Sequence, residues 1–123
     1  MNLSEISTPA LAYLGDSVIE LLVREHLVNI GISSSRRLND LAGHYVRAGA
    51  QATAVRRILG MLTEEENDFY KRGRNIGHTN VPKSASVTEY REATGMEVLF
   101  GYLHISGQTE RARELFAAAY PEN

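Results

Sequence analysis

A long, mostly apolar stretch near the amino end, residues 10–28, constrains the fold of this chain more than any other feature. Its apolar residues recur at three- and four-residue intervals and cover more than one side, which is typical of a helix packed against several neighbours. Residues four apart lie on the same face of a helix, so Asp16, Glu20 and Arg24 share a narrow polar stripe. The sequence therefore predicts a long, largely buried helix with an acid in its interior.

Asp16 has two interpretations. In one, Glu20 and Arg24 form a surface ion pair worth a few tenths of a kcal/mol, and Asp16 is solvated beside them. In the other, Asp16 is a metal ligand, because an acid on a largely buried helix is costly unless a cation or hydrogen-bond donors compensate its charge. Gly15 beside it costs the helix about 1 kcal/mol relative to alanine, which indicates that a backbone or a ligand comes close there.

The composition fits one globular domain. With 123 residues, of which 43% are hydrophobic, residues 1–123 suffice for one domain with a real core and are too short for two. The net charge of −2 argues against a uniformly basic nucleic-acid coat, and the lack of cysteine excludes disulfides and zinc–thiolate sites. No apolar run reaches the roughly 18 residues that span a membrane. We therefore expect a single soluble domain in the cytoplasm, with no membrane partner.

Start and stop signals divide the rest of the chain into further helices. Thr8 and Pro9 suit the cap and the first residue of the opening helix. Capping boxes open two more helices, at Thr63 and at Ser86, and Gly73 is expected to close the first of these two. No segment alternates as a strand does, so the sequence predicts an all-α fold. The further helices are expected over residues 36–43, 45–60, 64–72, 90–105 and 109–120.

A basic segment, residues 69–88, begins in the last turn of the fourth of these helices and continues beyond it. Between Phe69 and Thr88 the chain has no acid but four positive charges, so the remainder carries −6 within the total of −2. The four cations are Lys71, Arg72, Arg74 and Lys83. Such runs are commonly solvated loops, but a segment rich in Arg, Lys, Asn, Gly and Thr also suits contact with the phosphate backbone of a nucleic acid. Both interpretations stay open at this point.

Motifs for nucleotide cradles, zinc proteases and di-iron centres are absent from the sequence. What remains is a lone acid in the middle of each of two long apolar helices, Asp16 and Glu97. Gly95 and Gly101 suit close helix crossings. If the two helices cross antiparallel near Gly15 and Gly101, the two carboxylates can share one hard cation. Oxygen ligands in small number, with several retained waters, favour magnesium over zinc, and such a cation assists hydrolysis of a phosphodiester.

Several stretches resemble a known family. Residues 11–20, Leu-Ala-Tyr-Leu-Gly-Asp-Ser-Val-Ile-Glu, are similar to the signature helix of the ribonuclease III superfamily. Lys-Arg-Gly-Arg-Asn at 71–75, Tyr-Arg-x-x-Thr-Gly-Met-Glu at 90–97 and Gly-Tyr-Leu-His at 101–104 resemble more specifically Mini-ribonuclease III, the short bacterial form. The resemblance covers about the whole chain, with the motifs in the right order.

The resemblance implies an all-α endonuclease domain without a double-stranded-RNA-binding domain. It implies a homodimer that hydrolyses both strands of double-stranded RNA with Mg²⁺, and in bacteria this form is associated with maturation of the large-subunit (23S) ribosomal RNA precursor. It also implies that Asp16 is the catalytic acid and a metal ligand, and that Glu97 is the second metal ligand. The residues that the resemblance assigns to the RNA backbone are Arg72, Arg74, Asn75 and Lys83.

The chain departs from full-length ribonuclease III enzymes at two positions. Those enzymes have a Glu four residues before the signature Asp and an Asp three residues before the later Glu, where this chain has Ala12 and Thr94. The number of metal ions and a role for Glu20 as an extra ligand therefore stay open. Two rival hypotheses are a non-catalytic double-stranded-RNA-binding dimer that acts as a scaffold, whose RNA binding is salt-sensitive, and a helical interaction module whose basic segment is merely solvated.

Overall fold

The computed structural model describes residues 2–76 and 86–121, and within these ranges it contains helices and no strand. The predicted all-α fold is confirmed. In the same ranges, a helix with the length and apolarity to cross a membrane is not found. The helices are α1 (Thr8–Asn29), α2 (Ser35–Val46), α3 (Ala48–Ile58), α4 (Glu64–Arg74), α5 (Val87–Ile105) and α6 (Thr109–Ala119), with short 3-10 turns η1 (Leu3–Glu5) and η2 (Leu59–Met61).

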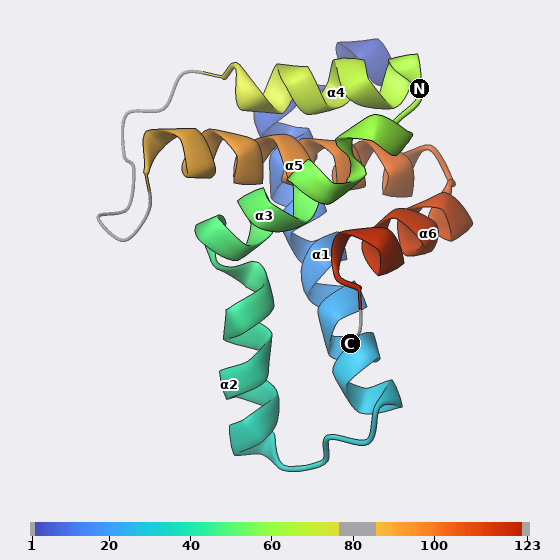
Figure 1. Cartoon of the computed structure of the whole chain (residues 1–123). Helices are drawn as coiled ribbons and strands as arrows, with labels where there is room; N and C mark the ends of the chain where they lie inside the picture. The colour runs from blue at the N-terminus through green and yellow to red at the C-terminus, as the bar shows by residue number, and fades with distance from the viewer. Residues whose placement is uncertain (1, 77–85, 122–123) are drawn as a thin grey trace.

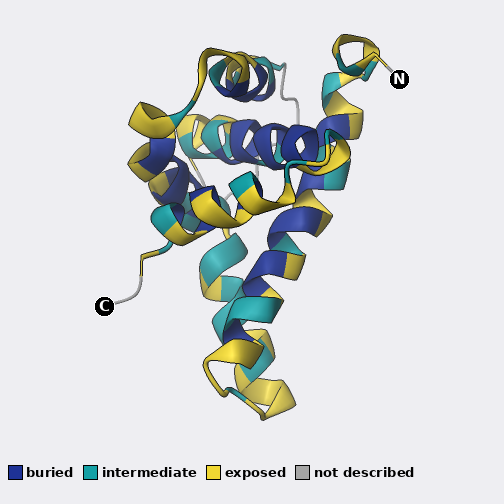
Figure 2. Cartoon of the chain, turned by 90° about the vertical axis from the view of Figure 1, so that its right-hand side faces the viewer, coloured by how far each residue is buried: buried dark blue, intermediate teal, exposed yellow. Residues whose placement is uncertain are grey.

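α5 forms the centre of the fold. It contacts α1, α3, α4 and α6, and every residue from 93 to 103 is buried except Glu97. Figure 1 shows α5 lying across the molecule, with α4 along one side and α3 and α6 on the other. Figure 2 shows the buried residues gathered along α5 and the helices that meet it. Glu97 is therefore an acid in the middle of the most buried helix of the described chain.

Residues 24–46 form a projection from this body, made of the last turns of α1, the connecting turn and α2. In Figures 1 and 2 the two helices extend together away from the other elements. α2 has no buried residue, and its apolar side chains, such as Leu38 and Leu41, are only partly covered by the core. Val28 and Ile30 at the far end of α1 are exposed. The projection is thus less buried than the body, although Leu27 within it is buried and Tyr45 packs against Tyr120.

The two predicted capping boxes are confirmed. The Thr63 hydroxyl accepts a hydrogen bond from the backbone N–H of Glu66 at 3.2 Å, and the Glu66 carboxylate accepts one from the N–H of Thr63 at 2.9 Å. Ser86 and Glu89 make the same reciprocal pair at 3.1 and 3.3 Å. Both signals are local in sequence, and each satisfies backbone donors that the first turn of a helix leaves unpaired.

The cap of α1 lies one residue earlier than predicted. Ser7 Oγ accepts a hydrogen bond from the N–H of Ala10 at 3.2 Å, so Thr8 and Pro9 are the first two helical residues. The Thr8 hydroxyl instead accepts a hydrogen bond from Nε of Arg72 at 3.2 Å. Ser and Thr are both good caps. Here Ser7 caps the helix and Thr8 contacts the distant Arg72, a contact that the local sequence does not show.

Two further predicted boundaries are wrong. The helix expected over 45–60 is interrupted at Arg47, whose extended backbone (φ −62°, ψ 148°) separates α2 from α3. The apolar spacing is continuous across Arg47, so the periodicity does not mark the break. Gly73 does not close α4, which continues to Arg74. Gly73 lies inside the helix because it faces α5 at very short distance.

Candidate active site

Two glycines let α1 and α5 cross with their backbones in contact. A Cβ atom on Gly15 would lie 1.6 Å from the carbonyl oxygen of Glu97, and one on Gly101 would lie 2.1 Å from the carbonyl oxygen of Leu11. The close crossing predicted at these glycines is confirmed, but α5 crosses α1 steeply rather than antiparallel (Figure 1). A steep crossing concentrates the contact at one point, and residues next to the two glycines are brought together there.

Asp16 and Glu97 meet at this crossing, and we call them the acidic pair. Asp16 is exposed, whereas Glu97 is partly buried. Burial, the negative charge of Asp16 and a hydrogen bond with Asp16 together raise the pKa of Glu97 from 4.5 to about 8. Without a cation, the Glu97 carboxyl is therefore mostly protonated at neutral pH and shares a hydrogen bond with Asp16.

The acidic pair has the chemistry of a hard-cation site. Two carboxylates in contact repel each other, and a divalent cation bound to both removes this repulsion and the cost of burying the charge of Glu97. Carboxylate oxygens in small number, with water in the other positions, suit Mg²⁺. In residues 2–76 and 86–121, three or more His, Cys, Asp or Glu side chains do not come together anywhere. Within these ranges the acidic pair thus offers two ligand side chains, and two carboxylates fit a cation that keeps several waters.

At the two positions where full-length enzymes have further acids, this chain has no other charged side chain in their place. Thr94 is 9% exposed, and its hydroxyl donates a hydrogen bond to the carbonyl oxygen of Tyr90 at 3.0 Å within α5. Ala12 is partly buried and packs against the core. Neither side chain offers a charged ligand to a cation.

Glu20 and Arg24 form the predicted surface ion pair. Their closest atoms, Oε1 and Nη2, are 3.1 Å apart, and the side chains are 34% and 69% exposed. Together with Asp16, Ser17 and Leu21 they line a shallow hollow on the outer side of α1. Glu20 thus borders the acidic pair, with its carboxylate already paired to Arg24.

The Arg72 guanidinium is bonded within the chain. Its Nη2 donates to the carbonyl oxygen of Ile6 at 2.8 Å, and its Nε donates to the hydroxyl of Thr8. The same group lies over the Phe69 ring, 5.0 Å from the centroid. Arg72 therefore joins the end of α4 to the segment that precedes α1.

Arg74 and Asn75 lie next to each other at the end of α4 and bond to each other. Arg74 Nε donates to the side-chain oxygen of Asn75 at 3.1 Å, and the guanidinium lies 5.8 Å from the centre of the Tyr70 ring. Asn75 is exposed and Arg74 is partly exposed. Lys83, the fourth predicted RNA contact, lies outside the described residues.

A second glycine crossing was only half predicted from the sequence. Gly95 was expected at a close crossing, and its partner is α4: a Cβ on Gly95 would lie 2.6 Å from the Tyr70 ring. A Cβ on Gly73 would lie 2.8 Å from the carbonyl oxygen of Thr94 and 2.7 Å from the side chain of Val98. The pairing was missed because a glycine near the end of a helix is equally a stop signal.

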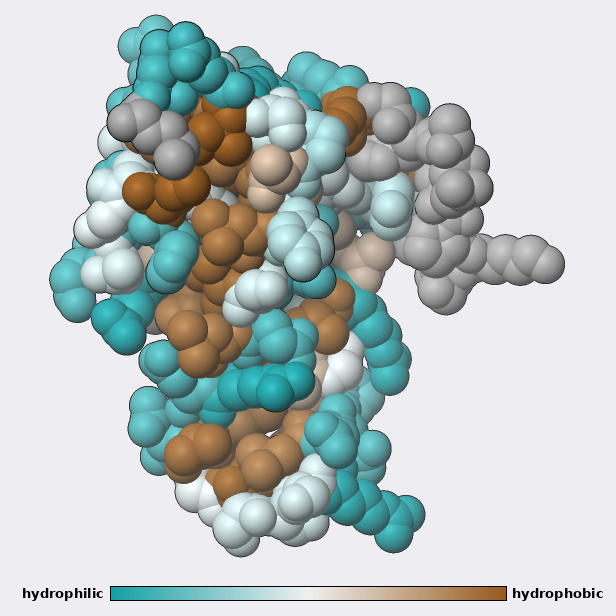
Figure 3. All heavy atoms as spheres, turned by 180° about the vertical axis from the view of Figure 1, so that it is seen from behind, coloured by the Kyte–Doolittle hydropathy of each residue, from teal (hydrophilic) through white to brown (hydrophobic). Residues whose placement is uncertain are grey.

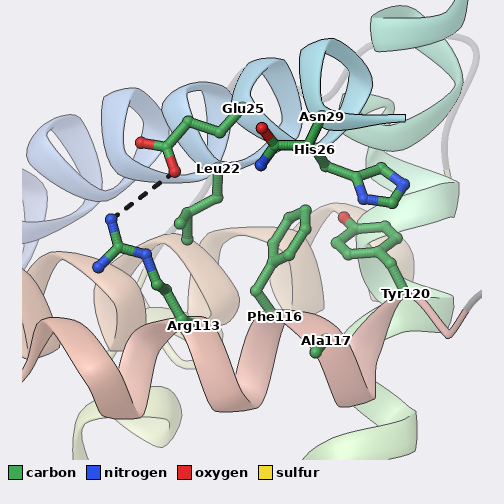
Figure 4. A pocket seen from close by; sticks show the side chains of 8 residues that line it. All are labelled: Leu22, Glu25, His26, Asn29, Arg113, Phe116, Ala117 and Tyr120. Carbon is green, nitrogen blue, oxygen red and sulfur yellow. Dashed lines mark ion pairs between the residues drawn. The ribbon is translucent and has the colours of Figure 1, made fainter. Parts of the chain in front are cut away.

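A separate hollow of about 430 Å³ lies between α1 and α6, away from the predicted site residues. Figure 4 shows Phe116 and Tyr120 on the α6 side, facing Leu22 and His26 on α1. Across its rim Glu25 and Arg113 form an ion pair at 3.7 Å. The hollow combines an apolar floor with an exposed ion pair and contains no member of the acidic pair.

Known proteins resemble the chain over most of its length. The model of the Ribonuclease III domain family matches residues 9–108, a range that includes the acidic pair. A protein of Enterococcus faecalis named Mini-ribonuclease 3 is 49% identical over 108 residues, covering 86% of this chain and 82% of the relative. Its namesake in Symbiobacterium thermophilum is 46% identical over 112 residues, with 89% and 84% covered. A crystal structure of a Fusobacterium nucleatum protein is 30% identical, has a TM-score of 0.83 and covers 91% of this chain and 89% of its own.

Proposed function

Because the chain belongs to the ribonuclease III family and is an endoribonuclease of that type, we propose that Asp16 and Glu97 form its active site and bind Mg²⁺. The observation that carries this assignment is the contact between the two acids at the crossing of α1 and α5. A half-buried carboxyl whose pKa is raised to about 8 beside a second acid has much to gain from a cation. Functional acids and bases are often found in such environments.

The residues divide the chemistry between them. The acidic pair would hold the cation, and the chemistry that the cation would supply there is orientation of a water and stabilisation of negative charge on the phosphodiester. The exposed Asp16 carboxylate is the ligand nearer the solvent, where the RNA approaches. Glu97 would serve as a ligand in its deprotonated form, because carboxylates bind metals as anions. Hydrolysis adds the water to phosphorus and breaks one P–O bond in the strand.

We further propose that the substrate is double-stranded RNA held partly by the basic segment. Arg74 and Asn75 are well placed to contact the RNA backbone, since both reach solvent next to each other at the end of α4. Arg72 and Lys83 remain predicted contacts, and Arg72 would have to exchange an internal hydrogen bond for a phosphate. RNA recognition would depend on duplex shape and on 2′-hydroxyl and phosphate contacts. The resemblance of the motifs to the Mini form supports maturation of the 23S ribosomal RNA precursor in the cytoplasm as the process.

A homodimer is the assembly that we propose for this activity. α1 carries exposed apolar side chains on one side, with Tyr13, Leu21 and Val28 at 84%, 53% and 61% exposure. Figure 3 shows several groups of apolar residues, separated by hydrophilic ones, on the face of the molecule where α1 lies. Such patches commonly mark protein interfaces. Sedimentation of the parent chain and of Leu21→Lys tests the proposal: a dimer that becomes a monomer supports it, and a monomeric parent contradicts it.

The decisive experiment is cleavage of a long double-stranded RNA by the purified protein, with Mg²⁺ or with a chelator. We expect cleavage only with Mg²⁺, and a loss of more than about tenfold in rate for Asp16→Asn, which corresponds to about 1.4 kcal/mol. Asp40→Asn is the matched control, because Asp40 is an exposed acid on α2 and makes the same change of side chain away from the acidic pair. RNA that is bound but never cut would favour the scaffold hypothesis, and unchanged binding after Arg72→Ala and Arg74→Ala would favour the interaction module.

A further inference from the structure

The turn of α5 around Glu97 is in backbone contact with two other helices. α1 approaches it at Gly15, where a Cβ would lie 1.6 Å from the carbonyl oxygen of Glu97. α4 approaches it at Gly73, where a Cβ would lie 2.8 Å both from the carbonyl oxygen of Thr94 and from the Cα of Gly95. A Cβ at either glycine would overlap the neighbouring backbone, so the helices pack backbone against backbone at both points. The turn that carries Glu97 therefore fixes α1 and α4 relative to each other.

The contact with α4 leads directly to the basic side chains. The Tyr70 ring packs on the backbone of Gly95, since a Cβ on Gly95 would lie only 2.6 Å from a ring carbon. Tyr70 is 2% exposed. The guanidinium of Arg74 lies over the same ring, and its Nε donates to Asn75. Arg74 thus contacts the Tyr70 ring, and this ring in turn packs on α5, the helix that carries Glu97.

We propose that Gly95 and Tyr70 are positioning residues, which hold Arg74 at a fixed place relative to the acidic pair. This inference rests on the proposed function. An RNA duplex is stiff, so a phosphate held at Arg74 determines which phosphodiester of the duplex reaches the acidic pair. A displacement of about 1 Å away from a productive geometry can cost about a hundredfold in rate. Gly95 and Tyr70 therefore act on the alignment of RNA for cleavage, beyond their contribution to packing.

Four variants separate alignment from packing. Gly95→Ala pushes the Tyr70 ring away from α5, and Tyr70→Leu removes the ring without adding atoms, so it keeps the proposal testable if Gly95→Ala does not fold. Tyr70→Phe keeps the ring and is the conservative variant. Gly43→Ala is the matched control, because Gly43 lies within a helix and a Cβ there would have no side chain or other element within 4 Å beyond its own stretch of helix.

The measurement is the rate of a single turnover on a defined duplex, with protein in saturating excess, beside the dissociation constants for RNA and for Mg²⁺. For Gly95→Ala and Tyr70→Leu we expect the rate to fall by about ten- to a hundredfold, with both dissociation constants within about threefold of the parent. The remaining cuts are expected to spread over neighbouring positions in the duplex. Tyr70→Phe and Gly43→Ala are expected to cut like the parent, at the parent's positions.

Each other outcome overturns the inference. Parent-like rate and cut positions in Tyr70→Leu would show that the ring does not align the RNA. Weaker RNA binding with an unchanged saturated rate would restrict these residues to affinity, and weaker Mg²⁺ binding would place their effect at the acidic pair. Failure of the proposed function is distinguishable, because the parent would then not cleave with Mg²⁺, or Asp16→Asn would cleave as the parent does.

Discussion

The body of the molecule and the projection of residues 24–46 bring helices together in different ways. In the body, α5 meets α1 and α4 at glycines, so that backbones touch, and four other helices surround it. In the projection, α2 buries no residue completely and rests on α1 by half-covered side chains. Backbone contact fixes a position closely, whereas contact through partly exposed side chains leaves freedom to adjust. The acidic pair lies in the first kind of region, where a catalytic geometry can be held.

The largest effect is expected from a cavity in the body. Leu99 is fully buried in the middle of α5, and Leu99→Ala removes apolar contacts and leaves a space that the glycine-locked helices cannot fill. We expect a loss of about 3 to 4 kcal/mol in the free energy of unfolding, measured by urea titration. A loss below about 1 kcal/mol would show that the body can collapse around the gap.

The next effect is a pH dependence of the free energy of unfolding that comes from the acidic pair. The pKa of Glu97 is about 8 in the folded protein against 4.5 in the unfolded chain, so the folded state binds the proton more tightly. The stability that this proton contributes is complete below pH 4.5 and is lost as the pH rises through 8. Glu97→Gln carries no such charge. At about 1.4 kcal/mol per pKa unit the full shift corresponds to roughly 5 kcal/mol, and solvent screening of the partly buried Glu97 reduces it. Without metal, we therefore expect the variant to match the parent at pH 4 and to exceed it at pH 9 by on the order of 2 kcal/mol.

Adding Mg²⁺ supplies the control for this pH dependence. A cation bound to both carboxylates should stabilise the parent at pH 8 and above, and should leave Glu97→Gln much less affected. Thermal unfolding at several pH values, with Mg²⁺ or with a chelator, measures both effects. Identical pH profiles for parent and variant would mean that the Glu97 carboxyl is as well solvated when folded as when unfolded.

A smaller effect is expected from the same kind of truncation in the projection. Leu38 lies on α2 and is only partly covered, so Leu38→Ala leaves a gap that side chains or water can fill. We expect a loss of about 1 kcal/mol, well below that of Leu99→Ala. Equal losses in the two leucine variants would remove the contrast between body and projection.

The smallest effect belongs to the exposed ion pair. Arg24→Ala breaks the contact with Glu20 on the outer side of α1 and leaves both positions in water. We expect a change of about 0.3 kcal/mol, which disappears at high salt. A change above about 1 kcal/mol, or a clear loss of Mg²⁺ affinity, would mean that Arg24 keeps Glu20 in place beside the acidic pair.

The sequence predicted the features that depend on neighbouring residues better than those that depend on distant contacts. The capping boxes at Thr63 and Ser86 are read from residues three apart, and both are present. The meeting of Asp16 and Glu97 was predicted because a glycine accompanies an acid on α1 and another lies near the acid on α5. Both features mark a close crossing without giving its angle.

Other features depend on residues that are far apart in the chain. The Glu66 carboxylate is 2% exposed and pairs with Arg111 at 2.9 Å, joining α4 to α6. Burial raises the pKa of Glu66, but hydrogen bonds from Arg111 and from the backbone of Thr63 outweigh it, so that the pKa is lowered. Arg72 was assigned to RNA by the family resemblance, and its bonds to the segment before α1 could not be read from the basic run in which it lies. Charge composition does not reveal which cations are already paired.

The central place of α5 also sets the order in which a newly made chain can become active. The ribosome releases α1, α2, α3 and α4 before α5, so these four helices emerge without the surface against which α1, α3 and α4 pack. Contacts between segments distant in sequence form late in folding. The Asp16 carboxylate, made near the beginning, has no partner until Glu97 has left the exit tunnel. A ribosome that makes this nuclease therefore holds an incomplete acidic pair, the proposed active site, until most of the chain has been translated.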